Sequence, residues 1–187
     1  MNSFINSLNA LSPLEKDAID DLILEISHKS YKRGDSILTA GRVCRHLHFL
    51  DRGLVKLSFQ RDDKEFIMRF FSEHSIFTGL DSYITQTNSD YSIIALEPTE
   101  TFYISHSNME FVSRKHHSIE TAFRKFVSIA SVNMMKRISE MLEENGTTRY
   151  NNFVQANDPI MQRISLGDLA SYLGITQVSL SRIRSRK

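Results

Sequence analysis

The chain has 187 residues, 41% of them hydrophobic and 24% charged, with seven Gly, three Pro and a formal net charge of +1. This composition is that of an ordinary globular protein and excludes a long disordered or low-complexity chain. The single cysteine, Cys44, excludes an internal disulfide and any cluster that needs several thiolates.

The N-terminal segment carries no export signal. Residues 1–17 lack a basic leader followed by an apolar run, and the chain nowhere approaches the roughly 18 consecutive apolar residues of a membrane span. The sequence therefore predicts a cytoplasmic protein with no membrane partner.

A short helix is predicted next. Ser12 precedes Pro13 and stands three residues before Glu15, a pattern that predicts a helix capped by Ser12. Apolar residues then recur at the spacing of one helical face, at Leu14, Ala18, Leu22, Ile23 and Ile26.

Short runs of alternating polarity begin at Tyr31 and continue to about Ile104. The runs at 55–60 and 66–70 alternate apolar with polar residues, which predicts half-buried strands. Turn signals separate the runs, at 32–35, 51–53, 61–64 and 97–98. Strands at this spacing predict an antiparallel sandwich or barrel.

A capping pattern at Ser107 and Glu110 predicts a return to helix, and a longer helix follows. Between about Ser118 and Glu144 there is no Gly or Pro. Apolar residues recur there every three or four positions and form a seam of Phe123, Val127, Ala130, Met134, Ile138 and Met141. A helix of about 27 residues spans about 40 Å, more than a small sheet can cover. We therefore predict that the seam is a homodimer interface; the alternative is that it packs within one subunit.

The sequence at 145–148 interrupts this helical pattern. Gly146 is suited to a left-handed helix end, with a Thr capping the next helix. We place a domain boundary at this point.

Two short helices are predicted near the C-terminus. Ser165 caps the first, which Gly174 ends, and Thr176 caps the second. The small Ala170 stands where the two helices must cross closely, and Ile175 fills the turn. This spacing predicts a helix-turn-helix with apolar positions Leu166, Leu169, Ala170, Leu173, Leu180 and Ile183.

Positive charge gathers at the same end. Residues 160–187 hold five basic residues and one acidic residue, so this segment carries +4 and the remainder −3. In the second helix, Gln177 is suited to adenine and Arg182 to guanine, while the residues at the helix start can hold a phosphate. The other basic residues supply charge to the DNA backbone. The predicted DNA-binding residues are Thr176, Gln177, Val178, Ser179, Arg182, Arg184, Arg186 and Lys187; the alternative is a solvated basic tail.

The order of these elements resembles that of the Crp/Fnr family of bacterial transcription regulators. The stretches 31–41 and 47–57, with glycines at their turns, look like the opening of that family's cyclic-nucleotide-binding β-roll. The long helix is similar to the family's dimerisation helix, and residues 164–184 are similar to its DNA-reading motif.

This resemblance implies an α+β fold and a dimeric transcription regulator. The implied domains are an antiparallel, jelly-roll-like β-roll sensor domain over residues 1–117, a dimerisation helix over 118–145 and a helix-turn-helix DNA-binding domain over 146–187. The implied partners are double-stranded DNA, a second copy of the chain and RNA polymerase. The sequence has no Gly-rich phosphate loop, nucleophile elbow or convincing pair of carboxylates, so we do not expect an enzyme.

The region that would hold a cyclic nucleotide departs from the family pattern. Members that bind cyclic AMP use a Gly-Glu pair and, further along, Arg-Ser or Arg-Thr, whose Arg neutralises the phosphate. Gly79 matches the first position, but no Glu follows it, and the Arg-Ser position falls at about Ser89-Asp90. From Phe70 to Ser113 there is no Lys or Arg, so a phosphate near Asp90 would meet like charge. Backbone amides remain a way to hold an anion.

We therefore expect a small-molecule effector of unknown identity, with cyclic AMP disfavoured. The predicted pocket residues are Gly79, Leu80, Asp81, Ser89, Asp90 and Tyr91.

Two further departures concern DNA. The family usually continues into a small β-wing, whereas this chain stops at Lys187, so we expect weak DNA binding by one subunit and a greater dependence on the dimer. Val178 stands where many members carry a base-reading Glu, and a Val can touch a thymine methyl but cannot accept a hydrogen bond from cytosine. The family's usual operator is therefore not expected.

Seven histidines remain as candidate metal or haem ligands. His46 and His48 lie two apart on a predicted strand and can share a face, but no third ligand is identified. We expect surface or hydrogen-bonded histidines and no metal. The alternative function for the chain is a cyclic-nucleotide or other small-ligand binding module, or a protein-interaction module, that no longer reads DNA.

Overall fold

The structure is a computed structural model, and it describes residues 1–185. The first half contains α1 (Asn2–Leu11), α2 (Lys16–Glu25), β1 (Ser27–Tyr31), β2 (Ser36–Leu38), β3 (His46–Arg52), β4 (Val55–Arg61), β5 (Lys64–Phe71), β6 (Ile76–Phe77) and α3 (Leu80–Thr85). The second half contains β7 (Ser92–Ala95), β8 (Thr99–Ser105), α4 (His106–Lys115), α5 (His117–Glu143), α6 (Gly146–Ala156), a 3-10 turn (Asp158–Ile160), α7 (Leu166–Leu173) and α8 (Gln177–Ser185).

Two antiparallel four-stranded sheets form the β-roll. Their strand orders are β1-β8-β3-β6 and β2-β7-β4-β5. Residues on these strands such as Phe49, Leu50, Ile93 and Ile104 are fully buried. Together with the helices, these sheets confirm the predicted α+β fold with an antiparallel roll.

The N-terminal helices differ from the prediction. The sequence analysis did not predict α1, which buries Phe4 and Leu8 and stacks Phe4 on Phe49 of β3 at 5.4 Å. The prediction that Ser12 is the N-cap of a helix is wrong. Ser12 is instead the C-cap of α1, and the next helix begins only at Lys16. Glu15 instead accepts a hydrogen bond from Ser118 at the start of α5.

A similar shift occurs after the last strand. The prediction that Ser107 caps a helix is wrong, since Ser105 is the cap of α4 and its hydroxyl accepts from the Asn108 amide at 3.1 Å. The helix begins two residues earlier than predicted because β8 ends directly in this cap.

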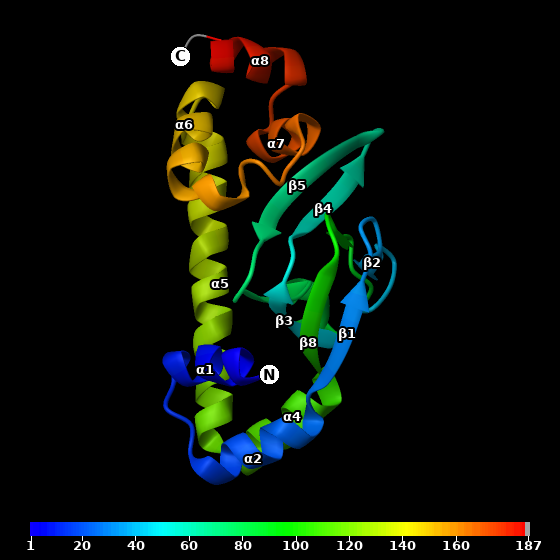
Figure 1. The fold of residues 1–187 in the computed structure, drawn as a ribbon, viewed down its shortest axis with the longest axis vertical. Coiled ribbons are helices and arrows are strands. Elements are labelled where there is room, and N and C mark those ends of the chain that lie inside the picture. The colour runs from blue at the N-terminus through cyan, green and yellow to red at the C-terminus, as the bar shows by residue number, and fades with distance from the viewer. Residues whose placement is uncertain (186–187) are drawn as a thin grey trace.

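The long predicted helix is present as α5, which runs along the whole molecule (Figure 1). The β-roll lies beside its N-terminal and middle parts, α6 and α7 lie beside the β4–β5 hairpin, and α8 lies at the far end of the molecule (Figure 1). None of the helices in residues 1–185 is long and apolar enough to cross a membrane.

The residue that caps the helix after α5 differs from the prediction. Asn145 caps α6, and its side-chain oxygen accepts from the amides of Thr147 and Thr148 at 3.0 Å each. The left-handed conformation predicted for Gly146 is wrong, because Gly146 is the first residue of α6.

We call residues 146–185 the C-terminal unit. Its buried residues form a second hydrophobic cluster, which also takes in Leu54 of the roll: Leu54, Tyr150, Phe153, Ile160, Leu169, Ala170, Leu173 and Leu180.

Candidate functional site

Helices α7 and α8 form a tight pair joined by a short turn. The Ser165 hydroxyl accepts from the Asp168 amide at 2.9 Å and so caps α7, as predicted. Gly174 ends α7 in the left-handed region with a φ of 65°, and Thr176 Oγ1 accepts from the Ser179 amide at 3.1 Å. Ala170 is 3% exposed, consistent with its predicted place at the helix contact.

One predicted apolar position of this pair is not buried. Leu166 is 48% exposed, because it is the first residue of α7 and lies away from the contact with α8. Leu169, Leu173 and Leu180 supply the buried face instead.

The four arginines of the C-terminal unit divide into two groups. Arg149 donates to the backbone oxygens of Leu173 and Glu144, so it holds the unit together. Arg163 makes ion pairs with the β-roll. Arg182 and Arg184 on α8 are exposed and form no ion pair within residues 1–185.

The predicted DNA-binding residues that the structure describes gather on or next to α8. All except Ser179, which is half-buried, are exposed: Thr176, Gln177, Val178, Arg182 and Arg184. Arg186 and Lys187 lie outside the described residues. The exposed side chains of α8 and of the residue before it thus present hydroxyl, amide and guanidinium groups to solvent, together with the apolar Val178.

Arg163 connects the C-terminal unit to the β-roll, a contact that the sequence did not predict. Its guanidinium donates to Glu73 at 2.8 and 3.0 Å and to Glu97 at 2.6 and 3.3 Å. The Gly53 amide also donates to Glu73, at 2.9 Å. Hydrogen bonds from Arg163 lower the pKa of Glu73 to about 2, and the two carboxylates raise the pKa of Arg163.

A second ion pair lies on the same interface. Lys56 of β4 contacts Asp168 of α7 and Glu65 of β5, each at 2.7 Å. Burial acts to raise the pKa of Asp168, but hydrogen bonds from Lys56 and Ser165 outweigh it and the pKa is lowered. Asp168 is the one acidic residue among residues 160–187. Because its carboxylate pairs with Lys56 of the roll, it does not pair with the arginines of α8.

Aromatic side chains complete this contact. Phe70 of β5 packs on Phe153 and Tyr172, with ring centroids 6.1 and 5.5 Å apart. The guanidinium of Arg137 on α5 lies 3.9 Å from the Tyr172 ring centroid, a cation–π contact. We call this whole surface the roll–unit contact.

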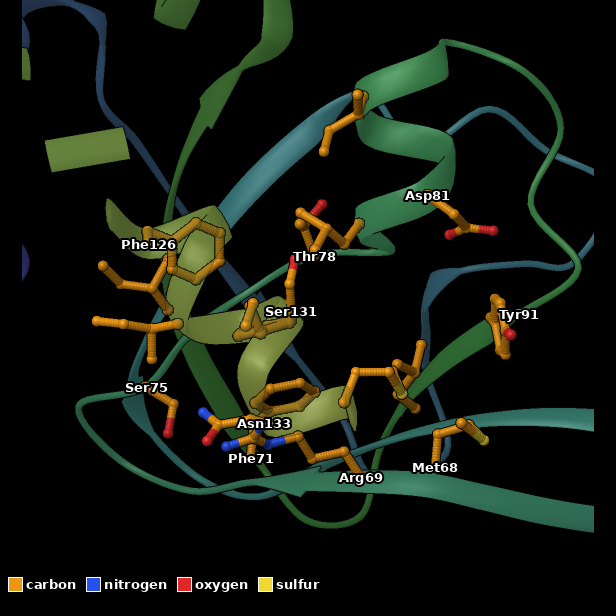
Figure 2. A pocket seen from close by; sticks show the side chains of 18 of the residues that line it. Met68, Arg69, Phe71, Ser75, Thr78, Asp81, Tyr91, Phe126, Ser131 and Asn133 are labelled. Atoms are coloured by element: carbon orange, nitrogen blue, oxygen red, sulfur yellow. The ribbon is translucent and has the colours of Figure 1, made fainter. Parts of the chain in front are cut away.

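On its other side the β-roll forms a cavity of about 850 Å³ against α5. Its walls come from β5, β6, α3 and the middle of α5, and Figure 2 shows labelled wall residues of β5, α3 and α5. Most of the lining is apolar and includes Met68, Phe71, Phe77, Phe126 and Met134.

Three of the six predicted pocket residues line this cavity: Leu80, Asp81 and Tyr91. The other three are placed elsewhere. Gly79 begins α3 against Leu38, where a Cβ would lie 2.7 Å from the leucine side chain, so its role is close packing. Ser89 is 1% exposed and accepts from the Tyr91 amide, and Asp90 is exposed.

The cavity carries little charge. Among the described residues that line it, Arg69 and Asp81 are the permanently charged ones. The Arg69 guanidinium lies 5.5 Å from the Phe71 ring centroid, and no ion pair joins it to a carboxylate in residues 1–185. Sequence reasoning found only part of this cavity, because its remaining wall forms where α5 passes the roll.

The two neighbouring histidines share a face of β3, as predicted, with ring centroids 5.9 Å apart. His48 is buried between Phe77 and Tyr103, and its Nδ1 lies 3.4 Å from the Thr101 hydroxyl, so it is hydrogen-bonded as one of the two expectations allowed. Burial, assisted by the nearby His46, lowers the pKa of His48 to about 3. No group of three His, Cys, Asp or Glu within residues 1–185 is arranged to hold a metal ion.

The predicted dimer seam divides along α5. Phe123 packs inside the subunit on Tyr83 and Phe126, and Val127 and Ala130 are half-buried. Farther along, large apolar side chains are exposed on neighbouring turns: Met134 (38%), Met135 (69%), Ile138 (52%), Met141 (38%) and Leu142 (81%). We call these five residues the exposed stripe; three of them, Met134, Met135 and Ile138, also line the edge of the cavity.

Comparison with known proteins agrees with this architecture. Residues 28–116 match the family model of the cyclic nucleotide-binding domain. A search of curated protein sequences gives no match.

Solved structures of Crp/Fnr-family regulators resemble the chain over most of its length. The c-di-GMP responsive global regulator CLP of Xanthomonas campestris is 15% identical, with a TM-score of 0.73 over 92% of this chain and 91% of that one. A CooA mutant of Carboxydothermus hydrogenoformans is 18% identical, with a TM-score of 0.71 over 88% and 77%. The catabolite activator protein of Thermus thermophilus is 16% identical, with a TM-score of 0.61 over 96% and 85%. At these identities the likeness concerns the fold, and the matched family and these neighbours are regulators or binding proteins rather than enzymes.

Proposed function

We propose that the chain is a DNA-binding transcription regulator of the Crp/Fnr type, which works as a homodimer and reads DNA with α8. The observation that carries the proposal is the division of the arginines in the C-terminal unit. Arg149 and Arg163 are used in structural contacts, whereas Arg182 and Arg184 lie exposed on one helix and form no ion pair with a carboxylate of residues 1–185. A helix with this surface can enter a major groove, where arginine reads guanine and also neutralises phosphate.

This proposal assigns a role to each part of the chain. The β-roll is the sensor domain, α5 is the dimerisation helix and residues from 146 onward are the DNA-binding domain, which is a helix-turn-helix. Two copies of α8, related by a twofold axis, would enter successive major grooves of a roughly palindromic site. A molecule bound at the roll would act by binding more tightly to one of two dimer geometries.

The dimer is proposed to form through the exposed stripe of α5. An isolated subunit would leave these five large apolar side chains in water, and a patch of this kind marks an interaction surface. Burying them in a second copy removes apolar area from water and places two C-terminal units side by side.

Binding to random-sequence duplex DNA at low ionic strength tests the DNA-binding proposal. We expect a dissociation constant that rises steeply with salt, because bound phosphates release counterions. Arg182→Ala should relax preference at one base position of a selected site, at a cost of about 1–3 kcal/mol. The control is Arg114→Ala, which removes an equally exposed arginine from α4, far from α8 in the fold. Absence of duplex binding at low salt would identify a ligand-binding or protein-interaction module instead.

Sedimentation tests the dimer proposal. Leu142→Glu places a charge within the stripe, and we expect it to raise the dimer dissociation constant about tenfold or more. Leu24→Glu is the matched control, because Leu24 is 80% exposed on α2 and lies outside the stripe. If both variants sediment like the unmodified chain, the interface lies elsewhere.

A further inference from the structure

We propose that the cavity between the β-roll and α5 binds an uncharged, largely hydrophobic small molecule. This assignment names the class of effector and so rests on the proposed regulator function. It differs from the expectation that the fold alone suggests, which is an anionic nucleotide.

The size and lining of the cavity support a hydrophobic ligand. Its volume of about 850 Å³ falls within the range of about 300–1,000 Å³ that is usual for small-molecule sites. Aromatic rings from β5, β6 and α5 (Phe71, Phe77 and Phe126) face it together with the thioethers of Met68 and Met134. Methionine side chains are flexible and make favourable contacts with aromatic rings, so this wall can adapt to an aromatic or polycyclic molecule.

The charges of the cavity support an uncharged ligand. Arg69 and Asp81 carry opposite charges, and Figure 2 shows them on β5 and α3 at different sides of the cavity. A phosphate beside Asp81 would meet like charge, whereas Arg69 alone would offer a single cation stacked on Phe71. The Ser75 hydroxyl and the Asn133 amide can form hydrogen bonds that orient a neutral molecule.

Strand β5 connects this cavity to the C-terminal unit. Phe71 lines the cavity, and its neighbour Phe70 contacts Phe153 and Tyr172 on the opposite side of the strand. A molecule that moves Phe71 therefore acts on the roll–unit contact through adjacent residues. We expect occupancy of the cavity to change DNA affinity.

Fluorescence titration with N-phenyl-1-naphthylamine, an uncharged dye that brightens in apolar surroundings, tests the assignment. The full chain should bind one dye per subunit saturably, and cyclic AMP should not displace it. Ile84→Lys places a cation in the cavity wall and should weaken dye binding about tenfold. Both Ile84 and the control site Leu24 are exposed, at 51% and 80%, so neither substitution should unfold the chain, and Leu24→Lys should bind the dye normally.

Several outcomes would overturn the assignment. These are absence of saturable dye binding, equal affinity in the two variants, displacement of the dye by cyclic AMP, and binding that appears only when the dimer dissociates. The last would show that a second copy of α5 fills the cavity. DNA binding measured on the same samples separates the two proposals: DNA binding without dye binding overturns the ligand assignment alone, whereas dye binding without DNA binding overturns the regulator function alone.

Discussion

The β-roll meets the rest of the chain on two sides that are built differently. At the roll–unit contact, charged groups are paired across the interface, with Arg163 between Glu73 and Glu97 and Lys56 against Asp168. Against α5 the roll leaves an apolar cavity of about 850 Å³ with two charged residues in its wall. At the roll–unit contact, the charged groups are neutralised by partners within the chain, and these ion pairs hold the C-terminal unit against the roll. The cavity beside α5, in contrast, leaves space for a ligand.

The largest predicted effect concerns a backbone position of the roll–unit contact. Gly53 has a φ of +110°, and a Cβ there would lie 2.5 Å from Thr99 Oγ1 and 2.8 Å from Thr99 Cα. Gly53→Ala should therefore lower the free energy of unfolding by about 3 kcal/mol, measured by urea denaturation. It should also disturb Glu73, which accepts from the Gly53 amide.

Gly34→Ala is the control for this prediction. Gly34 has a similar φ of +88°, but a Cβ added there would have no atom within 4 Å. Its substitution should cost about 1 kcal/mol from backbone strain alone. Equal losses in the two variants would mean that the close approach to Thr99 contributes nothing.

The next largest effect is expected for Arg163→Ala. Removing the guanidinium leaves two partly buried carboxylates without their cation, which should cost about 2 kcal/mol at neutral pH after allowance for solvent screening. Arg114→Ala, which breaks an exposed pair with Glu110, should cost about 0.5 kcal/mol or less. A loss for Arg163→Ala no larger than this control would contradict the description of the roll–unit contact as a fixed interface.

The effect of Arg163→Ala on the free energy of unfolding should depend on pH. Because folding lowers the pKa of Glu73 from 4.5 to about 2, its ion pair contributes fully above about pH 4.5 and is lost as the pH falls toward 2. The difference in unfolding free energy between the unmodified chain and Arg163→Ala should therefore be smaller at pH 3 than at pH 7. A difference that stays constant across this window would assign the stabilisation to packing of the Arg163 side chain.

The smallest effect on the free energy of unfolding is expected at the wall of the cavity. Ile84→Lys changes a cavity-lining residue that is already 51% exposed, so its cost should be within about 0.5 kcal/mol in the same urea assay. A cost of the size predicted for Arg163→Ala would show that the cavity wall is as tightly packed as the roll–unit contact.

Much of the fold could be predicted because its signals are local. Ser165, Gly174 and Thr176 lie at helix ends, where a cap or a left-handed residue acts on its immediate neighbours. The period of apolar residues similarly predicted a helix from about Ser118 to Glu144, and α5 runs from His117 to Glu143. Local signals were less reliable before α4, where Ser107 was the predicted cap but the nearby Ser105 caps the helix.

The candidate sites were less predictable because they depend on contacts between distant parts of the chain. Arg163 is one of the five basic residues of 160–187, yet its partners Glu73 and Glu97 lie on the roll. No spacing in the sequence reveals this pairing. The cavity was predicted only at α3 and Tyr91, since its other walls come from β5, β6 and α5.

The salt dependence of duplex DNA binding tests the central claim most directly, because it counts the cations that reach DNA phosphates. We predict that Arg184→Gln lowers the magnitude of the slope of log K against log salt by about 0.9, the value for one lost phosphate contact. Arg163→Gln should leave this slope unchanged, because its guanidinium is held by Glu73 and Glu97. A slope that is zero for the unmodified chain, or one that Arg163→Gln lowers as much as Arg184→Gln does, would contradict the account.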